Sequence, residues 1–230
     1  MATHSANIDW CEANYAVTPF VAEWMNTCSM IPGIACTGAE CLRCITTLRR
    51  HGGPSAKPSF VYAAIAYGLS LWLSVGSFMF HATLQRAWQI HDELPMLYLG
   101  VWTAMCVYRR VHGTPVTPAD VRDDVTTLGC TGILVTYLYG WTTRSYLLFV
   151  VPYAIATIAT LSVLLAHILQ NTNPASRRQG VGGIASLLLG FLLWIVDHVL
   201  CLPASPFHAL WHIAVVKAQC NLIEYVTMAL

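Results

Sequence analysis

Charged side chains are scarce in this sequence. Only 10% of its 230 residues are Asp, Glu, Lys or Arg, whereas 56% are hydrophobic and the mean hydropathy is +0.56. An ordinary soluble domain carries about 25% charged residues. The formal net charge is +1, so the sequence has no basic surface of the kind that binds nucleic acid. These deficits exclude a soluble nucleic-acid-binding domain and predict an all-α membrane protein.

Three other features are missing from the sequence. Residues 1–20 have neither the basic start nor the apolar run of a secretory signal peptide. The chain has no internal repeat and no low-complexity tract, which argues against a transporter built from paired repeats. Nine cysteines do not indicate a disulfide scaffold in a membrane protein, because most of them are expected to pack as small hydrophobic residues.

Six stretches are long and apolar enough to predict membrane-spanning helices, since a span needs about 20 mostly apolar residues. They cover roughly 59–81, 93–111, 125–141, 145–169, 181–201 and 206–228. A seventh stretch, roughly 21–45, is weaker because it contains several polar residues and a proline. These are Glu23, Asn26, Pro32, Glu40 and Arg43.

The positions of the basic residues are consistent with a span over 21–45 and predict the orientation of the chain in the membrane. If the chain has seven spans, nine basic residues lie on one side of the membrane and two lie on the other. The nine are Arg43, Arg49, Arg50, Lys57, Arg109, Arg110, Arg122, Arg177 and Arg178, and the two are Arg86 and Arg144. The positive-inside rule then predicts a lumenal N-terminus and a cytosolic C-terminus. If the chain had only six spans, the N-terminus would move to the cytosol but the later loops would keep their sides. The distribution of basic residues therefore supports the orientation, but it does not decide whether the stretch 21–45 spans the membrane. We expect a lumenal segment over 1–20 and a seven-helix catalytic domain over 21–230.

This topology brings three histidines to one depth of the membrane. His208 and His212 are four residues apart and share a helix face, and His81 lies near the lumenal end of another span. Ser77 and Asp92 fall at the same level. Three imidazoles beside a carboxylate are typical of a catalytic zinc site, which keeps one position open for water. The alternative is that the histidines lie at the membrane interface and bond to the backbone.

Such a site would carry out hydrolysis. Zinc held by three neutral imidazoles lowers the pKa of its water toward about 7, so that the water can attack an amide or ester carbonyl. Asp92 could accept the proton of the water and return it to the leaving nitrogen, and Ser77 could stabilise the oxyanion. Alternatively, Ser77 beside Gly76 is a helix-packing residue, and Asp92 is the N-cap of the next helix.

A second polar cluster precedes the first span. Asp9, Glu12, Asn14 and Glu23 offer oxygen atoms of the kind that calcium prefers. A solvated acidic loop with a helix cap would have the same composition, and the spacing is not that of an EF-hand.

Two cysteines and one lysine complete the set of residues that need explanation. Cys11 and Cys201 both fall on the oxidising lumenal side, where a bridge between them would tie the N-terminal segment to the sixth of the seven expected spans, 181–201. Lys217 is expected to be buried in the middle of the last span, where it would either extend to the cytosolic face or pair with an acidic residue that the sequence does not identify.

These residues belong to motifs that resemble the alkaline ceramidases, within a superfamily of seven-helix membrane hydrolases that includes the adiponectin receptors. The N-terminal motifs are Asp9-Trp10-Cys11-Glu12-Ala13-Asn14-Tyr15 and Ala22-Glu23-Trp24-Met25-Asn26-Thr27. The central ones are Gly76-Ser77-Phe78-Met79-Phe80-His81-Ala82-Thr83-Leu84 and Asp92-Glu93-Leu94-Pro95-Met96. The last are Trp194-Ile195-Val196-Asp197 and His208-Ala209-Leu210-Trp211-His212. The residues Asn14-Tyr15-Ala16-Val17-Thr18 are similar to the phytoceramidase-like branch.

The resemblance implies a zinc-dependent amidase that cleaves the N-acyl bond of ceramides in the endoplasmic reticulum or Golgi membrane. It implies zinc binding by His81, His208 and His212, with Ser77 and Asp92 assisting catalysis. It implies a calcium site formed by Asp9, the Trp10 carbonyl, Glu12, Asn14 and Glu23, and it favours a Cys11–Cys201 disulfide. The expected partners are the ceramide substrate and the bilayer, with no obligate protein partner. The alternative is a receptor of the adiponectin-receptor type, whose zinc is structural or weakly hydrolytic.

Overall fold

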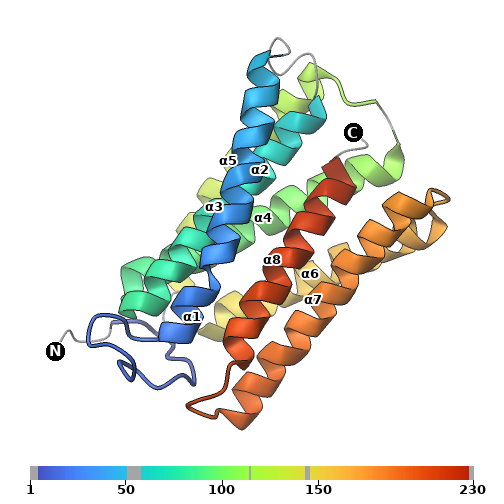
Figure 1. Cartoon of the computed structure of the whole chain (residues 1–230). Helices are drawn as coiled ribbons and strands as arrows, with labels where there is room; N and C mark the ends of the chain where they lie inside the picture. The colour runs from blue at the N-terminus through green and yellow to red at the C-terminus, as the bar shows by residue number, and fades with distance from the viewer. Residues whose placement is uncertain (1–4, 51–57, 114, 143–145, 228–230) are drawn as a thin grey trace.

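The protein is all-helical in the computed structural model, which describes residues 5–50, 58–113, 115–142 and 146–227. Lys57, Arg144 and residue 228, which entered the expectations above, lie outside these ranges. The helices of the described chain are α1 (Trp24–Ser29), α2 (Ile31–Arg50), α3 (Pro58–Thr83), α4 (Arg86–His112), α5 (Pro118–Thr142), α6 (Tyr146–Gln170), α7 (Pro174–Leu200) and α8 (Phe207–Thr227). Figure 1 shows the long helices forming one elongated bundle.

Each of the six strongly apolar stretches corresponds to one helix within the described residues. Within the described residues, three helical stretches are both long and apolar enough to cross a membrane: Pro58–Thr83, Phe149–Gln170 and Pro174–Leu200. The other long helices fall short of this measure, so the seven-span count stays a prediction. Lys217 lies exposed on the outer face of α8 rather than among the packed helices.

Three helices begin well before their apolar stretches, and polar side chains cap two of them. At α7, the Asn173 side chain accepts hydrogen bonds from Ala175 N and Ser176 N, and Pro174 occupies the first turn. At α5, the Thr117 hydroxyl and the Asp120 carboxylate bond to each other's backbone N–H in a capping box.

Helix α4 likewise starts at Arg86, seven residues before the predicted span. Its N-cap is Gln85, so the alternative that Asp92 caps this helix is wrong. Asp92 lies in the second turn because the helix already begins in the residues that follow Gln85, before the apolar stretch.

The weak first span is divided into two helices. Helix α1 ends at Ser29, and the Met30 N–H turns back to the Thr27 carbonyl at 3.2 Å. Pro32 explains the break, because a proline has no N–H for the carbonyl four residues earlier and its ring crowds that carbonyl. Asn26 therefore lies on the short helix α1 with Glu23 at its N-cap, whereas Glu40 and Arg43 lie on α2.

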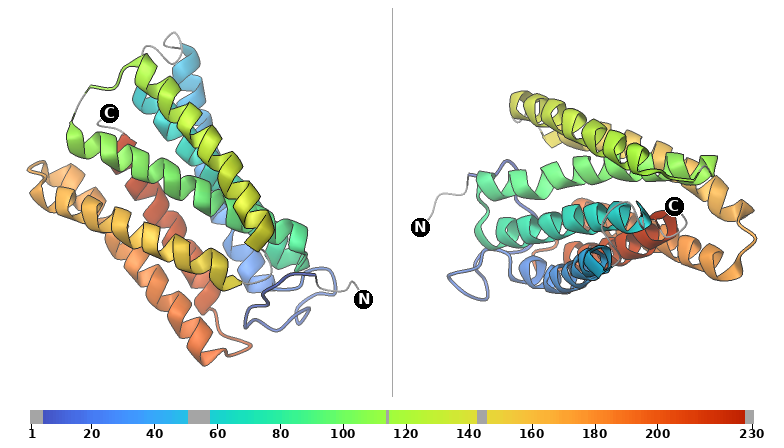
Figure 2. Two further views of the ribbon diagram at one scale, coloured as in Figure 1. Left: turned by 180° about the vertical axis from the view of Figure 1, so that it is seen from behind. Right: turned by 90° about the horizontal axis from the view of Figure 1, so that it is seen from above.

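The core of the bundle lies away from α1 and the N-terminal segment. Tyr62 of α3 and Trp102 of α4 are fully buried there and stack with ring centroids 5.0 Å apart. The Trp102 indole N–H donates to the Tyr62 carbonyl at 3.0 Å, which satisfies the one polar atom of a buried tryptophan. In Figure 2, α5 lies on the outside of the bundle, on the side opposite α2.

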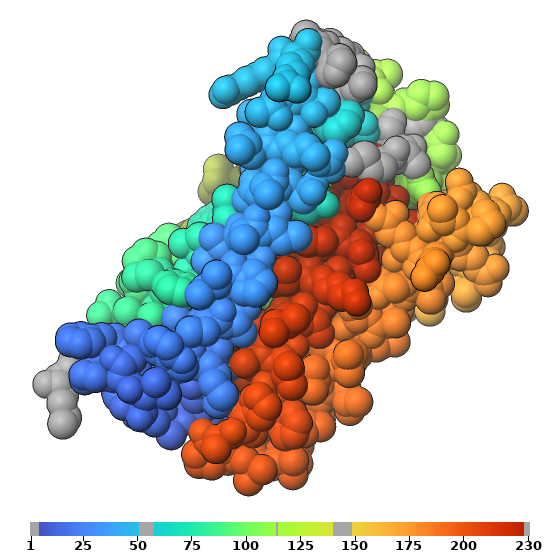
Figure 3. Space-filling model, viewed as in Figure 1, coloured from blue at the N-terminus to red at the C-terminus, as the bar shows by residue number. Residues whose placement is uncertain are grey.

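One end of the bundle gathers segments that are distant in sequence. The last turn of α3, the first turns of α4 and α8, and the end of α7 meet there. The N-terminal segment packs over this end, beside the start of α8, as the dark blue atoms of Figure 3 show. The predicted site residues belong to these segments or to the neighbouring turns of α3, α4 and α8.

Candidate functional site

Three buried histidines form a cluster at this end of the bundle. His81 comes from the last turn of α3, and His208 and His212 come from the first two turns of α8. One ring nitrogen from each lies within 4.8 Å of the other two, close enough for a single metal ion to be held. The three residues are at most 3% exposed. The prediction that these histidines meet is confirmed.

The Nδ1 atoms of the three rings face outward to oxygen atoms. His81 Nδ1 pairs with Glu23 Oε2, and His212 Nδ1 lies 2.7 Å from Ser29 Oγ. His208 Nδ1 lies 4.0 Å from an Asp197 carboxylate oxygen, beyond hydrogen-bonding distance. Histidines that bind metals usually use their second ring nitrogen in such contacts.

Two Nε2 atoms lack a partner in the part of the chain that is described. His208 Nε2 and His212 Nε2 are buried and make no hydrogen bond there. A buried polar atom without a partner costs about 1–3 kcal/mol, and such atoms are rare in native proteins. A metal ion between the rings would satisfy them, so the residues present fit the group that the sequence predicted.

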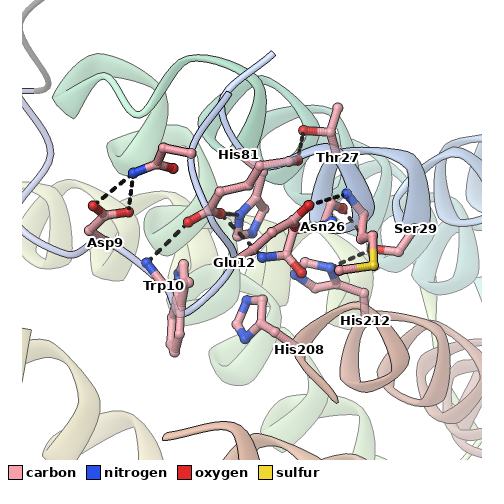
Figure 4. A network of polar contacts seen from close by, with 12 residues as sticks. Asp9, Trp10, Glu12, Asn26, Thr27, Ser29, His81, His208 and His212 are labelled. Atoms are coloured by element: carbon pink, nitrogen blue, oxygen red, sulfur yellow. Dashed lines mark hydrogen bonds and ion pairs between the residues drawn. The ribbon is translucent and has the colours of Figure 1, made fainter. Parts of the chain in front are cut away.

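The N-terminal segment forms the outer wall of the cluster. The Trp10 ring stacks on His208 with centroids 3.9 Å apart (Figure 4). It also meets Trp194 of α7 edge to face, with centroids 6.4 Å apart. Cys11 and Cys201 are joined with their sulfur atoms 2.07 Å apart, which ties the same segment to the residue that follows α7. The histidines are therefore covered from outside the bundle.

Ser77 and Asp92 reach the cluster from inside the bundle. The Asp92 carboxylate lies beside the Ser77 hydroxyl, and both side chains line a cavity that His212 also lines. The structure therefore brings the two predicted catalytic residues to the same wall as one of the candidate metal ligands.

The cavity has a volume of about 430 Å³ and is mainly apolar. Leu73, Met96, Leu99, Phe191 and Leu222 are among its lining residues. Along α8 it extends from Trp211 to Ile223, which corresponds to about 18 Å of helix. A polar end with histidine, serine and aspartate and a long apolar remainder match a ligand that has a polar group attached to a hydrocarbon chain.

The predicted calcium residues are drawn together near the histidines. Asn14 Nδ2 donates to both Asp9 carboxylate oxygens at 3.2 and 3.0 Å, and Trp10 N–H donates to Glu23 Oε1 at 3.1 Å. Glu12 instead accepts from the backbone N–H groups of Met25 and Asn26 at the start of α1, at 2.6 and 2.9 Å.

Burial raises the pKa of Glu12, with the negative charge of Glu23 adding to the effect, while the backbone N–H donors act in the opposite direction. The carboxyl groups of Asp9, Glu12 and Glu23 therefore lie close together in a partly buried segment. A bound cation would reduce the repulsion between their negative charges. Asn14 Oδ1 is buried without a partner among the described residues and is an available ligand atom.

Sequence reasoning gave no role to Asn26 and Ser29, which lie between the two clusters. Asn26 Nδ2 donates to Glu23 Oε2 at 3.2 Å, and Ser29 contacts His212. A signal for them existed: Glu23, Asn26 and Ser29 recur at intervals of three along a segment expected to enter lipid, and such a polar stripe is costly unless it has partners.

Comparisons with known proteins show the family to which this chain is similar. A family model described as Ceramidase matches residues 2–229. The chain is 30% identical over 228 residues to alkaline ceramidase 3 of Mus musculus and 28% identical over 222 residues to an alkaline ceramidase of Arabidopsis thaliana. Each alignment covers 91% of this chain and 78% of the relative. An alkaline ceramidase of Saccharomyces cerevisiae is 35% identical over 105 residues, covering 44% of this chain and 30% of that protein.

Proposed function

The chain belongs to the ceramidase family and is a hydrolase of the alkaline ceramidase type, and we propose that it cleaves the N-acyl amide bond of ceramides to give a sphingoid base and a fatty acid. The observation that carries this proposal is the cluster of three buried histidines at the polar end of a long apolar cavity. A ceramide has the matching form, with one amide group and two hydrocarbon chains.

The histidines His81, His208 and His212 would hold zinc through one ring nitrogen each. Bound zinc would supply a Lewis acid and an activated water at neutral pH. Asp92, on the cavity wall beside Ser77, is the group to accept the proton of the attacking water and to deliver it to the leaving nitrogen. The Ser77 hydroxyl would donate a hydrogen bond to the carbonyl oxygen as negative charge develops on it.

The proposed setting is a membrane of the endoplasmic reticulum or Golgi, with seven spans and the site on the lumenal side. The three apolar helical stretches and the family support a membrane location. In this setting the acyl chain stays among apolar helices while its amide reaches the histidines. The lumenal side is oxidising, which suits a disulfide between Cys11 and Cys201.

Calcium would bind at the N-terminal segment through Asp9, the Trp10 carbonyl, Glu12, Asn14 and Glu23. The convergence of three carboxylates and the unpartnered Asn14 oxygen support this proposal. Binding would require Glu12 and Glu23 to share their oxygens with the contacts they already make. Calcium would then stabilise the segment that covers the histidines.

The test is hydrolysis of a fluorescent-acyl ceramide by the purified protein in detergent, with zinc quantified in the same sample. His212→Ala should lose both turnover and zinc. His112→Ala is the matched control, because His112 is exposed at the opposite end of the bundle and contacts only its own helix in the described structure. Zinc without turnover on any ceramide would overturn the assignment and favour the receptor alternative.

A further inference from the structure

Ser29 makes two short contacts at the end of α1. Its hydroxyl oxygen lies 2.7 Å from the Asn26 carbonyl oxygen and 2.7 Å from His212 Nδ1 (Figure 4). The residue is 8% exposed, and it is the last residue of a six-residue helix. Both contacts are therefore made in a buried environment, where each donor needs an acceptor.

The two contacts together determine where the protons lie. A carbonyl oxygen can only accept, so the single hydroxyl proton of Ser29 is given to Asn26. The Ser29 oxygen must then accept the hydrogen bond from His212, which places a proton on Nδ1. A neutral imidazole carries one proton, so Nε2 of His212 is left with a free lone pair. This is the nitrogen that has no partner in the described part of the chain.

The break between α1 and α2 creates this arrangement. In a continuous helix, the Asn26 carbonyl would accept from the Met30 N–H, but that N–H bonds to Thr27 instead. Asn26 is thus one of the helix-end carbonyls without a backbone donor, and the Ser29 hydroxyl satisfies it. Glu12 holds the other end of the same short helix through two backbone N–H groups.

We propose that Ser29 is a positioning residue that keeps His212 in the Nδ1-protonated tautomer and so presents its Nε2 lone pair to the metal. The inference rests on the proposed metal-binding role of the histidines. Glu23 contacts His81 Nδ1 through a carboxyl oxygen, whereas Ser29 contacts His212 through a hydroxyl whose direction is set by its own bond to Asn26. Ser29 does not contact the substrate cavity.

The first experiment measures the zinc affinity of Ser29→Ala by competition with a graded chelator, and loss of such an outer partner is expected to weaken binding by about 10–100-fold. Ser29→Thr keeps the hydroxyl and should restore the affinity. Thr37→Ala is the control for loss of a buried hydroxyl, because Thr37 bonds to the Gly33 carbonyl in α2 and contacts no histidine. It should keep the parent affinity.

The second experiment observes the tautomer directly. Ring ¹⁵N signals of the metal-free protein, with His212 identified by comparison with His212→Ala, should show a protonated Nδ1 in the parent and in Ser29→Thr. Ser29→Ala should lose this preference. A merely structural role for Ser29 would change the unfolding temperature without changing the tautomer.

The outcomes separate the inference from the function on which it rests. A parent protein that binds no metal would overturn the proposed function. A parent that binds zinc, together with a Ser29→Ala protein of equal affinity and unchanged tautomer, would overturn the role of Ser29 alone. If Ser29→Ala does not fold, Ser29→Val takes its place: it has nearly the shape of threonine but no oxygen acceptor, so weaker zinc binding is expected, and parent-like binding would refute the inference.

Discussion

Gly76 of α3 lies directly against the carbonyl group of His91 in α4. A Cβ atom at position 76 would stand 2.0 Å from the His91 oxygen and 2.9 Å from the Asp92 nitrogen. Pro95 contributes to this contact, because it has no N–H to offer to the His91 carbonyl four residues earlier. The next residue along each helix is Ser77 or Asp92, so this backbone contact sets the distance between the two proposed catalytic side chains.

Gly76→Ala should therefore impair the enzyme without removing any functional group. The added methyl must push α3 and α4 apart, at a cost of about 1–3 kcal/mol for overpacking, and should lower ceramide turnover by separating Ser77 from Asp92. Thermal unfolding and turnover measure the two effects. Gly129→Ala in α5 is the control, since a Cβ there meets nothing within 4 Å. Normal turnover in Gly76→Ala would show that the helices yield without disturbing the site.

Removal of the metal should destabilise the protein as well as inactivate it. A ligand that binds only the folded state at 100 times its Kd stabilises that state by about 2.7 kcal/mol. A strong zinc chelator should thus lower the unfolding temperature, and added zinc should restore it. The same chelator should leave the unfolding temperature of His212→Ala unchanged. An equal decrease in both proteins would mean that the chelator acts elsewhere.

Calcium should stabilise the N-terminal segment through Asp9 and Asn14. We expect calcium to raise the unfolding temperature of the parent and to do so less in Asp9→Asn, which removes one charge from the cluster. Asp123→Asn is the charge-matched control, because Asp123 is exposed on α5 and pairs only with the adjacent Arg122 among the described residues. Magnesium should not replace calcium, since it demands a stricter octahedral geometry.

Asp120 should give a pH-dependent contribution to stability at the opposite end of the bundle. Hydrogen bonds from the Thr117 hydroxyl and N–H, followed by the Arg109 guanidinium, lower the pKa of Asp120 to about 2. A depressed folded-state pKa means that the contribution is present above the ordinary value, near 3.9, and is lost as the pH falls toward 2. Asp120→Asn should unfold at a lower temperature than the parent at pH 7. The two unfolding temperatures should converge as the pH is lowered from 4, and a constant difference would contradict the assignment.

The sequence predicted the helices and the cluster of histidines because both depend on patterns along the chain. Apolar stretches locate the spans, and a topology of spans places His81 near His212 without knowledge of any contact. It could not predict where α4 begins, since polar residues before Asp92 extend the helix. Nor could it predict that Ser29 meets His212, because that contact depends on the break at Met30 and on the packing of α1 against α8.

The candidate site has a further property that concerns its assembly in the cell. Its residues come from both ends of the chain, with Trp10 and Glu23 translated early and His208 and His212 translated late. A nascent chain shorter than 212 residues cannot contain the three-histidine cluster, and Cys11 has no Cys201 to meet until residue 201 has been made. Assembly of the three-histidine cluster and its covering by the N-terminal segment must therefore follow synthesis of the preceding helices, so under the proposed function a partly synthesised chain has no complete site.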